Sequence, residues 1–271
     1  MNFLSHPRRA RSLGYVHGMN ANLAETLETY ARGIIRGIHP IDSDQSEAVL
    51  RALNNWGWDD DLELYLPFDE TSGQTAFDLS GNGNTGTATG TTIVDGVFGK
   101  ARSFIGTVAD YVSASATNFI TAPPLTFEAW IYPDVRDQMT IFSKGNLNNE
   151  PSYAFLTQAN GKLRFFAYST GFGTSDSTAL YNASEWTHVA VTVDASWNCL
   201  FYINGIAGGG SQVAGSTAFV NTDALTMGKL SYCDAWFCDG LLDEMRQYSR
   251  VLTADEIYLH YLAGALKLGL I

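Results

Sequence analysis

The sequence predicts a mainly β protein, an antiparallel jelly-roll sandwich preceded by a short N-terminal α-helical arm. From about Leu62 onward, apolar residues alternate with polar ones at a period of two, as in half-buried strands. Clusters of Gly, Asn, Asp and Ser separate these segments at short intervals. No helical pattern lies between them, which favours antiparallel sheets over βαβ units.

The composition fits one sizeable β domain with an appendage. The chain has 271 residues, 45% of them hydrophobic and 13% aromatic. Its formal net charge of -12 argues against a nucleic-acid partner, which requires clustered Lys and Arg. The cysteines form no zinc-ligand set and are expected to be free thiols, although Cys233 and Cys238 could pair across a loop; the third is Cys199.

The N-terminal arm, residues 1–61, is expected to hold two short helices. Asp42 and Gln45 have capping-box spacing at the start of the second helix. Because short helices are unstable alone, each must pack on the following domain or on another chain. The apolar stripe of the first helix consists of Leu23, Leu27, Tyr30, Ile34 and Ile38.

The strands of the predicted domain, residues 62–262, follow from the alternation. The segment LELYLPF places Leu62, Leu64, Leu66 and Phe68 on one face, LTFEAWIYP places Leu125, Phe127, Ala129 and Ile131 on one face, and WTHVAVTVD does the same with Val189, Val191 and Val193. Further strands are predicted in ARSFIG, DYVSAS, TIFSKG, SYAFLTQ, KLRFFAY, CLFYING, ALTMGK and GLLDEMRQY.

A C-terminal helix is predicted in SRVLTADEIYLHYLAG. Thr253 and Glu256 have the spacing of a capping box, and Gly264 stands where a C-terminal cap belongs. Residues 263–271 then form a tail.

Taken in order, eight segments resemble the laminin-G-like jelly roll of the concanavalin A-like lectin and glucanase superfamily, over roughly residues 62–262. The resemblance implies two curved antiparallel sheets and frequent binding of carbohydrate, protein or calcium, without fixing a ligand. The segments are AFDLSGNGNTGT, GVFGKARSF, DYVSA, LTFEAWIYP, WTHVAVTVD, LFYINGIAGG, LTMGK and GLLDEMRQYSRVLTADEI.

The glycine-rich segment DLSGNGNTGT, residues 78–87, could be a calcium loop or a tight turn. It lacks the Lys of a phosphate loop and is flanked by strands. Relatives of the resembled family often hold calcium between loops of this kind, and Asp243, which shares strand parity with Leu241 and Met245, is the expected second carboxylate. In the alternative, Asp78 caps backbone amides and Asp243 accepts backbone or Arg hydrogen bonds. The loop residues at calcium-ligand spacing are Asp78, Ser80, Asn82 and Asn84, but Thr89 stands where an EF-hand has its bidentate Glu.

No catalytic constellation is found, so an enzyme is not predicted. Glucanases of the resembled superfamily carry paired carboxylates in an ExDxxE arrangement on one strand, whereas Asp243 and Glu244 are adjacent and point to opposite faces. The histidines form no HExxH pair, and His188 is expected to be a packed strand residue.

A glycan site would need aromatic platforms on loops beside polar groups. The alternative is that these aromatic residues anchor their loops. Trp130 and Trp186 are expected to pack within the fold. The candidate platform residues are Tyr232, Trp236 and Phe237 in SYCDAWFCDG, and Tyr168 and Phe172 in AYSTGFGTSDS.

These patterns lead to a non-catalytic structural or recognition protein, displayed on a larger assembly through its N-terminal arm. Neither a signal peptide nor a membrane span is recognised in the sequence, so we expect synthesis in the cytoplasm and display on a phage virion surface, as capsid decoration or for tail adhesion. Arg8, Arg9 and Arg11 of the arm are expected to contact capsid or tail proteins, together with its apolar stripe. The alternative is a soluble or secreted, hence extracellular, carbohydrate-binding module; a glycoside-active enzyme ranks third.

Overall fold

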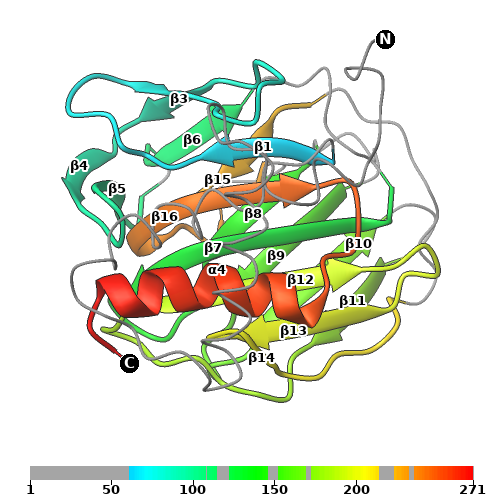
Figure 1. Ribbon diagram of the computed structural model, residues 1–271. Helices are drawn as coiled ribbons and strands as arrows, with labels where there is room; N and C mark the ends of the chain where they lie inside the picture. Colours follow the sequence, from blue (N-terminus) through cyan, green and yellow to red (C-terminus); the bar gives the residue numbers. More distant parts are fainter. Residues whose placement is uncertain are drawn as a thin grey trace, which may run out of the picture.

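A computed structural model of the chain describes residues 61–107, 109–114, 122–145, 152–168, 172–213, 223–231 and 235–270. The predicted helical arm therefore lies outside the described residues, apart from Asp61. The described part folds as two antiparallel sheets that pack face to face, with one helix near the C-terminus (Figure 1). The predicted jelly-roll sandwich is confirmed, and the helix of the described part is C-terminal.

The first sheet has strand order β14-β13-β12-β7-β16-β5-β4, and β1 pairs with β16 beside β5. Every pairing in it is antiparallel. Its strands are β1 (Leu62–Leu66), β4 (Thr92–Asp95), β5 (Lys100–Ile105), β7 (Leu125–Pro133), β12 (Thr187–Val193), β13 (Cys199–Ile203), β14 (Ile206–Ala207) and β16 (Asp239–Tyr248).

The second sheet has strand order β11-β10-β9-β8-β15-β6-β3-β2 and is likewise antiparallel. The strand β11 forms one edge and β2 the other. Its strands are β2 (Thr75–Ala76), β3 (Gly86–Thr89), β6 (Tyr111–Ala114), β8 (Thr140–Lys144), β9 (Ser152–Thr157), β10 (Leu163–Tyr168), β11 (Phe172–Asp176) and β15 (Leu225–Met227).

The main core lies between the sheets and follows the predicted alternation. Its members from β7 are Leu125, Phe127, Ala129 and Ile131, all buried. Phe127 packs on Phe142 of the opposite sheet with ring centroids 4.8 Å apart. Burying such faces is the dominant favourable term in folding.

The prediction for β1 is wrong at one residue. The register of β1 with β16 shifts between Leu62 and Leu64, so that Leu64 and Leu66 face the main core while Leu62 joins a separate cluster. That cluster also contains Tyr65, Tyr248 and Ile257. A bulge moves the side chains that precede it to the other face of the strand. The alternation of apolar and polar residues in the sequence does not show where such a bulge lies.

The helix α4 (Ala254–Lys267) packs on the outer face of the first sheet (Figure 1). Thr253 and Glu256 form the predicted capping box. The predicted end at Gly264 is wrong, because the helix continues to Lys267 and is capped at Leu268. Gly264 instead lies against Trp130: an added Cβ would be 2.3 Å from Cζ2 of the indole.

Candidate functional site

The loop after β2 is held by Asp78, in the manner of a turn cap. Its Oδ1 accepts the backbone N–H groups of Tyr65 at 3.0 Å and Ser80 at 2.9 Å, and its Oδ2 accepts that of Asn84 at 2.7 Å. The amide of Asn82 donates to the carbonyl of Leu62 at 2.7 Å, and that of Asn84 to Glu63 at 2.8 Å. The loop is thereby fixed to β1, as the turn alternative predicted.

Asp243 holds a different loop. It is fully buried, and its Oδ2 accepts the N–H groups of Val97 at 2.8 Å and Phe98 at 3.4 Å. Burial and then the charge of Glu244 raise the pKa of Asp243 well above its usual value. A register shift between Asp243 and Arg246 places Asp243 beside Trp130, while Met245 faces the core, so the predicted parity with Met245 is wrong.

These contacts do not fit a preformed calcium site. The oxygens of both carboxylates are already occupied by N–H donors, and a cation would have to displace them. Within the described ranges, no group of three or more His, Cys, Asp or Glu side chains is placed to hold a metal ion. Calcium binding stays a prediction, which melting temperatures in calcium and in chelator can test.

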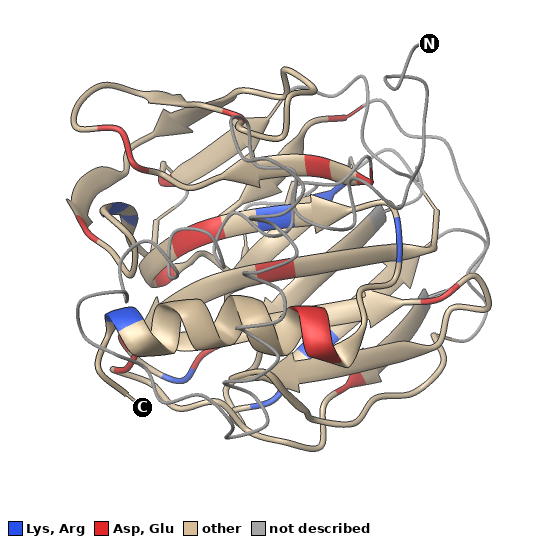
Figure 2. Ribbon diagram, in the orientation of Figure 1, with Lys and Arg blue, Asp and Glu red and all other residues tan. Residues whose placement is uncertain are grey.

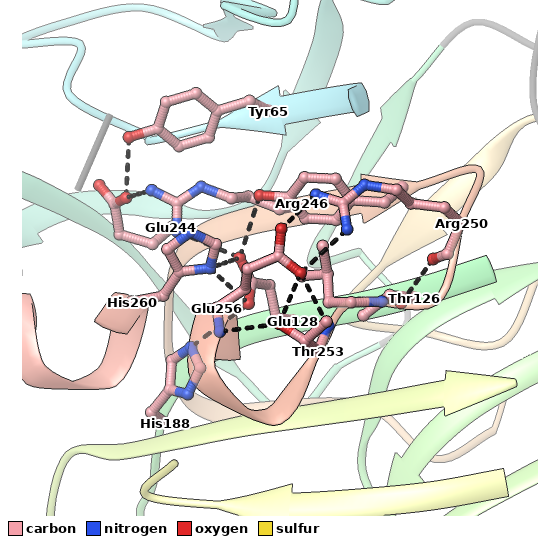
Figure 3. A network of polar contacts seen from close by, with 12 residues as sticks. Tyr65, Thr126, Glu128, His188, Glu244, Arg246, Arg250, Thr253, Glu256 and His260 are labelled. Atoms are coloured by element: carbon pink, nitrogen blue, oxygen red, sulfur yellow. Dashed lines mark hydrogen bonds and ion pairs between the residues drawn. The ribbon is translucent and has the colours of Figure 1, made fainter. Parts of the chain in front are cut away.

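A buried polar network on the outer face of the first sheet escaped the sequence analysis. Figure 3 shows that it joins β1, β7, β12, β16 and α4. At its centre is Glu128 of β7, which has no exposed surface. Nδ1 of His260 lies 2.9 Å from Oε1 of Glu128, and Nη1 of Arg246 lies 3.5 Å from the same oxygen.

The network extends from Arg246 toward β1. Nη2 of Arg246 donates to Oε2 of Glu244 at 2.5 Å, and the hydroxyl of Tyr65 donates to the same oxygen at 2.8 Å. The guanidinium also lies 4.3 Å from the ring centroid of Tyr65. Figure 2 shows an acidic band on β7 beside acidic and basic bands on β16. The arrangement neutralises charges that could not otherwise be buried.

Electrostatics keep Glu128 ionised. Burial acts to raise its pKa, but the charge and hydrogen bond of His260, with the charges of Arg246 and His188, hold that pKa at about 2. His188 has its Nε2 3.8 Å from Oε2 of Glu128, and burial lowers the pKa of His188 to about 3. Because the whole group is buried, it docks α4 on the sheet rather than offering a surface to a ligand.

The predicted aromatic platform is only partly described. Trp236 is half-buried and packs edge-on against Phe166, with ring centroids 6.3 Å apart. The carbonyl of Trp236 accepts the N–H of Thr140 at 2.9 Å, so its loop is attached to the outer face of the second sheet. Phe237 is half-buried, and Tyr168 is half-buried on β10 in register with Phe172. Tyr232 and the side chain of Phe172 lie outside the described residues.

The remaining predictions concern the cysteines, a membrane span and the residues of the N-terminal arm. Cys199 and Cys238 are buried free thiols, and burial raises the pKa of Cys199 to about 12. Cys233 lies outside the described residues. None of the helices in the described ranges is long and apolar enough to cross a membrane. The arm residues Arg8, Arg9, Arg11, Leu23, Leu27, Tyr30, Ile34 and Ile38 also lie outside the described residues.

Comparison with known families decides the identity of the fold. The family model of the concanavalin A-like lectin/glucanases superfamily matches residues 106–258. The chain belongs to this superfamily. The match includes Glu128, His188, Trp236 and Arg246, whereas Tyr65 and His260 of the buried network lie outside the matched residues.

Solved structures with the superfamily fold include several binding domains. Domain 4 of AbnA, an extracellular arabinanase from Geobacillus stearothermophilus solved with arabinotriose, is 20% identical with a TM-score of 0.60, covering 73% of this chain and 97% of that one. The binding domain of Paraclostridial Mosquitocidal Protein 1 is 19% identical with a TM-score of 0.58, and the match covers 77% of this chain and 52% of that domain. The receptor binding domain of botulinum neurotoxin type G is 13% identical with a TM-score of 0.58, and the match covers 74% of this chain and 51% of that domain.

At these levels of sequence identity, the similarity to the solved structures establishes a shared fold alone. The chain spans about half the length of the two toxin binding domains. No curated protein matches the chain.

Proposed function

We propose that this protein is a non-catalytic binding domain whose ligand is a carbohydrate. The likeness to the arabinanase domain solved with arabinotriose, and to binding domains of toxins, supports a binding role. A fold is compatible with many functions, so the ligand class is argued from the surface of this chain.

The observation that carries the proposal is the half-buried indole of Trp236. The edge-on contact with Phe166 and the hydrogen bond from the Thr140 N–H to the Trp236 carbonyl hold this residue against the second sheet. Part of the side chain stays exposed. A pre-positioned aromatic face can stack on the C–H face of a sugar ring without a large entropy cost. This combines both sequence hypotheses, because the same residue anchors its loop and offers a platform.

The proposal of a non-catalytic role is supported by the state of the ionisable groups. The close group of Glu128, Glu244, His188 and His260 is buried, and Arg246 contacts both carboxylates. General acid–base chemistry on a glycoside requires carboxyl groups that reach the scissile bond. In their described positions these groups bind α4 to the sheet instead.

The test compares Trp236→Ala with Trp186→Ala in the full chain. Trp186 is a matched control, a half-buried tryptophan next to Tyr132 on the other sheet. Binding is measured on a glycan array and by gel retardation in arabinan, galactan, xylan and amylose. We expect Trp236→Ala to weaken binding by about 5-fold to 150-fold, taking as the scale the about 1–3 kcal/mol that an aromatic side chain contributes when a nucleic-acid base stacks on it.

Two results would contradict the proposal. The first is that the wild-type chain binds no glycan in either assay. The second is that Trp186→Ala abolishes binding while Trp236→Ala, with an unchanged melting temperature, does not.

Display on a phage virion or other assembly remains part of the proposal only as a prediction. It rests on the formal charge of residues 1–57, where six Arg and five Asp or Glu give +1 against -13 for the remainder, and on the apolar stripe of the arm. In that role the jelly roll would present its carbohydrate site at the particle surface. The extracellular module remains the alternative.

A further inference from the structure

The outer face of the second sheet carries a polar strip next to the Trp236 platform. On β10, Leu163, Phe165 and Ala167 face the core, so that Arg164, Phe166 and Tyr168 face outward. Trp236 covers Phe166, which is 1% exposed, whereas Arg164 and Tyr168 on either side of it remain partly accessible.

The neighbouring edge strand extends this strip. Asp176 of β11 lies opposite Arg164, and Thr174 lies opposite Phe166. Both are half-buried. The outward side chains of β10 and β11 beside the indole are therefore a cation, an anion, a hydroxyl and a phenol, which together offer donors and acceptors next to aromatic faces.

Arg164 and Asp176 form a two-point ion pair. Nε of Arg164 lies 2.6 Å from Oδ1 of Asp176, and Nη2 lies 2.9 Å from Oδ2. The side chains keep 29% and 31% of their surface exposed. The hydrogen bond and charge of Arg164 lower the pKa of Asp176 despite burial, so the carboxylate is ionised at neutral pH. Two hydrogen bonds of this kind fix a planar pair with remaining donor and acceptor capacity toward solvent.

We infer that this strip selects a neutral saccharide, whose hydroxyl groups bind the Arg164–Asp176 pair while a ring face stacks on Trp236. The inference rests on the proposed carbohydrate-binding function and adds the ligand class. A sugar hydroxyl both donates and accepts hydrogen bonds, so it can bond to a carboxylate and a guanidinium that lie side by side.

The charges favour a neutral ligand over an acidic one. Asp176 already neutralises Arg164, and an acidic sugar would have to compete with Asp176 for the guanidinium. Lys162, which also acts on Asp176, is the nearby cation that works against this selectivity. The net charge of -12 adds long-range repulsion of anions.

The experiment uses the full chain, a glycan array with neutral, sialylated and uronate oligosaccharides, and gel retardation in neutral polysaccharides and in polygalacturonate. Arg164→Gln and Asp176→Asn are each expected to lower affinity for the best neutral glycan about 10-fold, since hydrogen bonds from charged groups are among the strong ones. Their melting temperatures should change little, because solvent screens an ion pair whose side chains keep 29% and 31% of their surface exposed.

A charge exchange, Arg164→Asp with Asp176→Arg, is the matched control. It keeps an ion pair across β10 and β11 but interchanges donor and acceptor positions. We expect it to retain the wild-type melting temperature and to lack the neutral-glycan affinity.

The outcomes separate the two proposals. Preference for acidic glycans, or wild-type affinity in Arg164→Gln and Asp176→Asn while Trp236→Ala loses binding, overturns this inference and leaves the proposed function standing. Absence of any glycan binding by the wild type overturns the proposed function, and this inference with it.

Discussion

Glu128 is a carboxylate without exposed surface, and its neighbours keep it charged. His260, Arg246 and the hydroxyl of Tyr248, at 3.3 Å, all lie against it. A buried charge is costly unless it is paired, and removal of one partner from such a group typically costs about 3–5 kcal/mol. His188 lies at the edge of this network, and among the described contacts neither of its ring nitrogens has a hydrogen-bond partner.

This environment predicts acid sensitivity that depends on His188. Its folded pKa is about 3, below the usual value near 6.5, so the unfolded chain binds the extra proton between these values and stability falls as pH decreases through that window. Between pH 7.5 and pH 5.0 the contribution of His188 is about 2 kcal/mol. Urea unfolding of the wild type and of His188→Gln at both pH values measures it.

The variant should show a smaller loss of stability on acidification than the wild type. Glu128, with its pKa at about 2 against an ordinary value of 4.5, also loses stabilisation on acidification, but only below about pH 4.5, outside this comparison. Equal losses in the two proteins would show that His188 takes up its proton in the folded state at its ordinary pKa.

At the scale of elements, α4 is positioned by one close approach as well as by the network. Gly264 brings the helix backbone against Trp130, and Tyr261 stacks on the same indole with centroids 6.0 Å apart. Glycine is unfavourable inside a helix by about 1 kcal/mol relative to alanine, so its presence here reflects packing.

Gly264→Ala is therefore expected to destabilise the protein by about 1–3 kcal/mol, despite the better helix propensity of alanine, because the new methyl group overlaps the buried indole. The measurement is the free energy of unfolding in denaturant. In a Trp130→Phe background, where the clashing ring atoms are absent, the same substitution should cost less. A stabilising effect in the wild-type background would contradict the described contact.

The elements were predictable where one local pattern determines them. The core-facing residues of LTFEAWIYP and the capping box at Thr253 each depend on neighbouring residues, and the structure confirms both. The prediction that this strand is half-buried is wrong, because β7 is buried on both faces. The bulges at Leu62–Leu64 and Asp243–Arg246 depend on the register with partner strands, so the alternation alone mispredicted Leu62 and the parity of Asp243.

The network was not predictable for a similar reason. Glu128 meets Arg246 and His260 across sequence separations of 118 and 132 residues, and Tyr65 meets Glu244 across 179. Each would be read alone as an outward-facing strand or helix residue. The available signal was that Glu128 and Trp130 share a face of one strand, which suggests that something covers that face.

At the scale of the whole molecule, the main core is made by residues that follow the N-terminal arm. Its described members run from Leu64 to Met245 and come from both sheets. We therefore expect a chain lacking residues 1–57 to be soluble and to unfold in a single cooperative thermal transition, measured by size-exclusion chromatography and circular dichroism. Loss of higher-order assembly in the same variant would agree with the proposed role of the arm, whereas aggregation would show that the arm belongs to the domain.

The strand β16 has a consequence for synthesis of the chain. It pairs with β7, with β5 and with β1, so the last described strand pairs with the first. In a nascent chain still lacking residues 239–248, β1 has no partner among the described strands, and β5 pairs with β4 but is not connected to β7. The core faces of these strands therefore stay accessible until translation is almost complete. Such long-range pairing slows folding and lengthens exposure to aggregation, so the jelly roll completes its fold only after β16 leaves the ribosome.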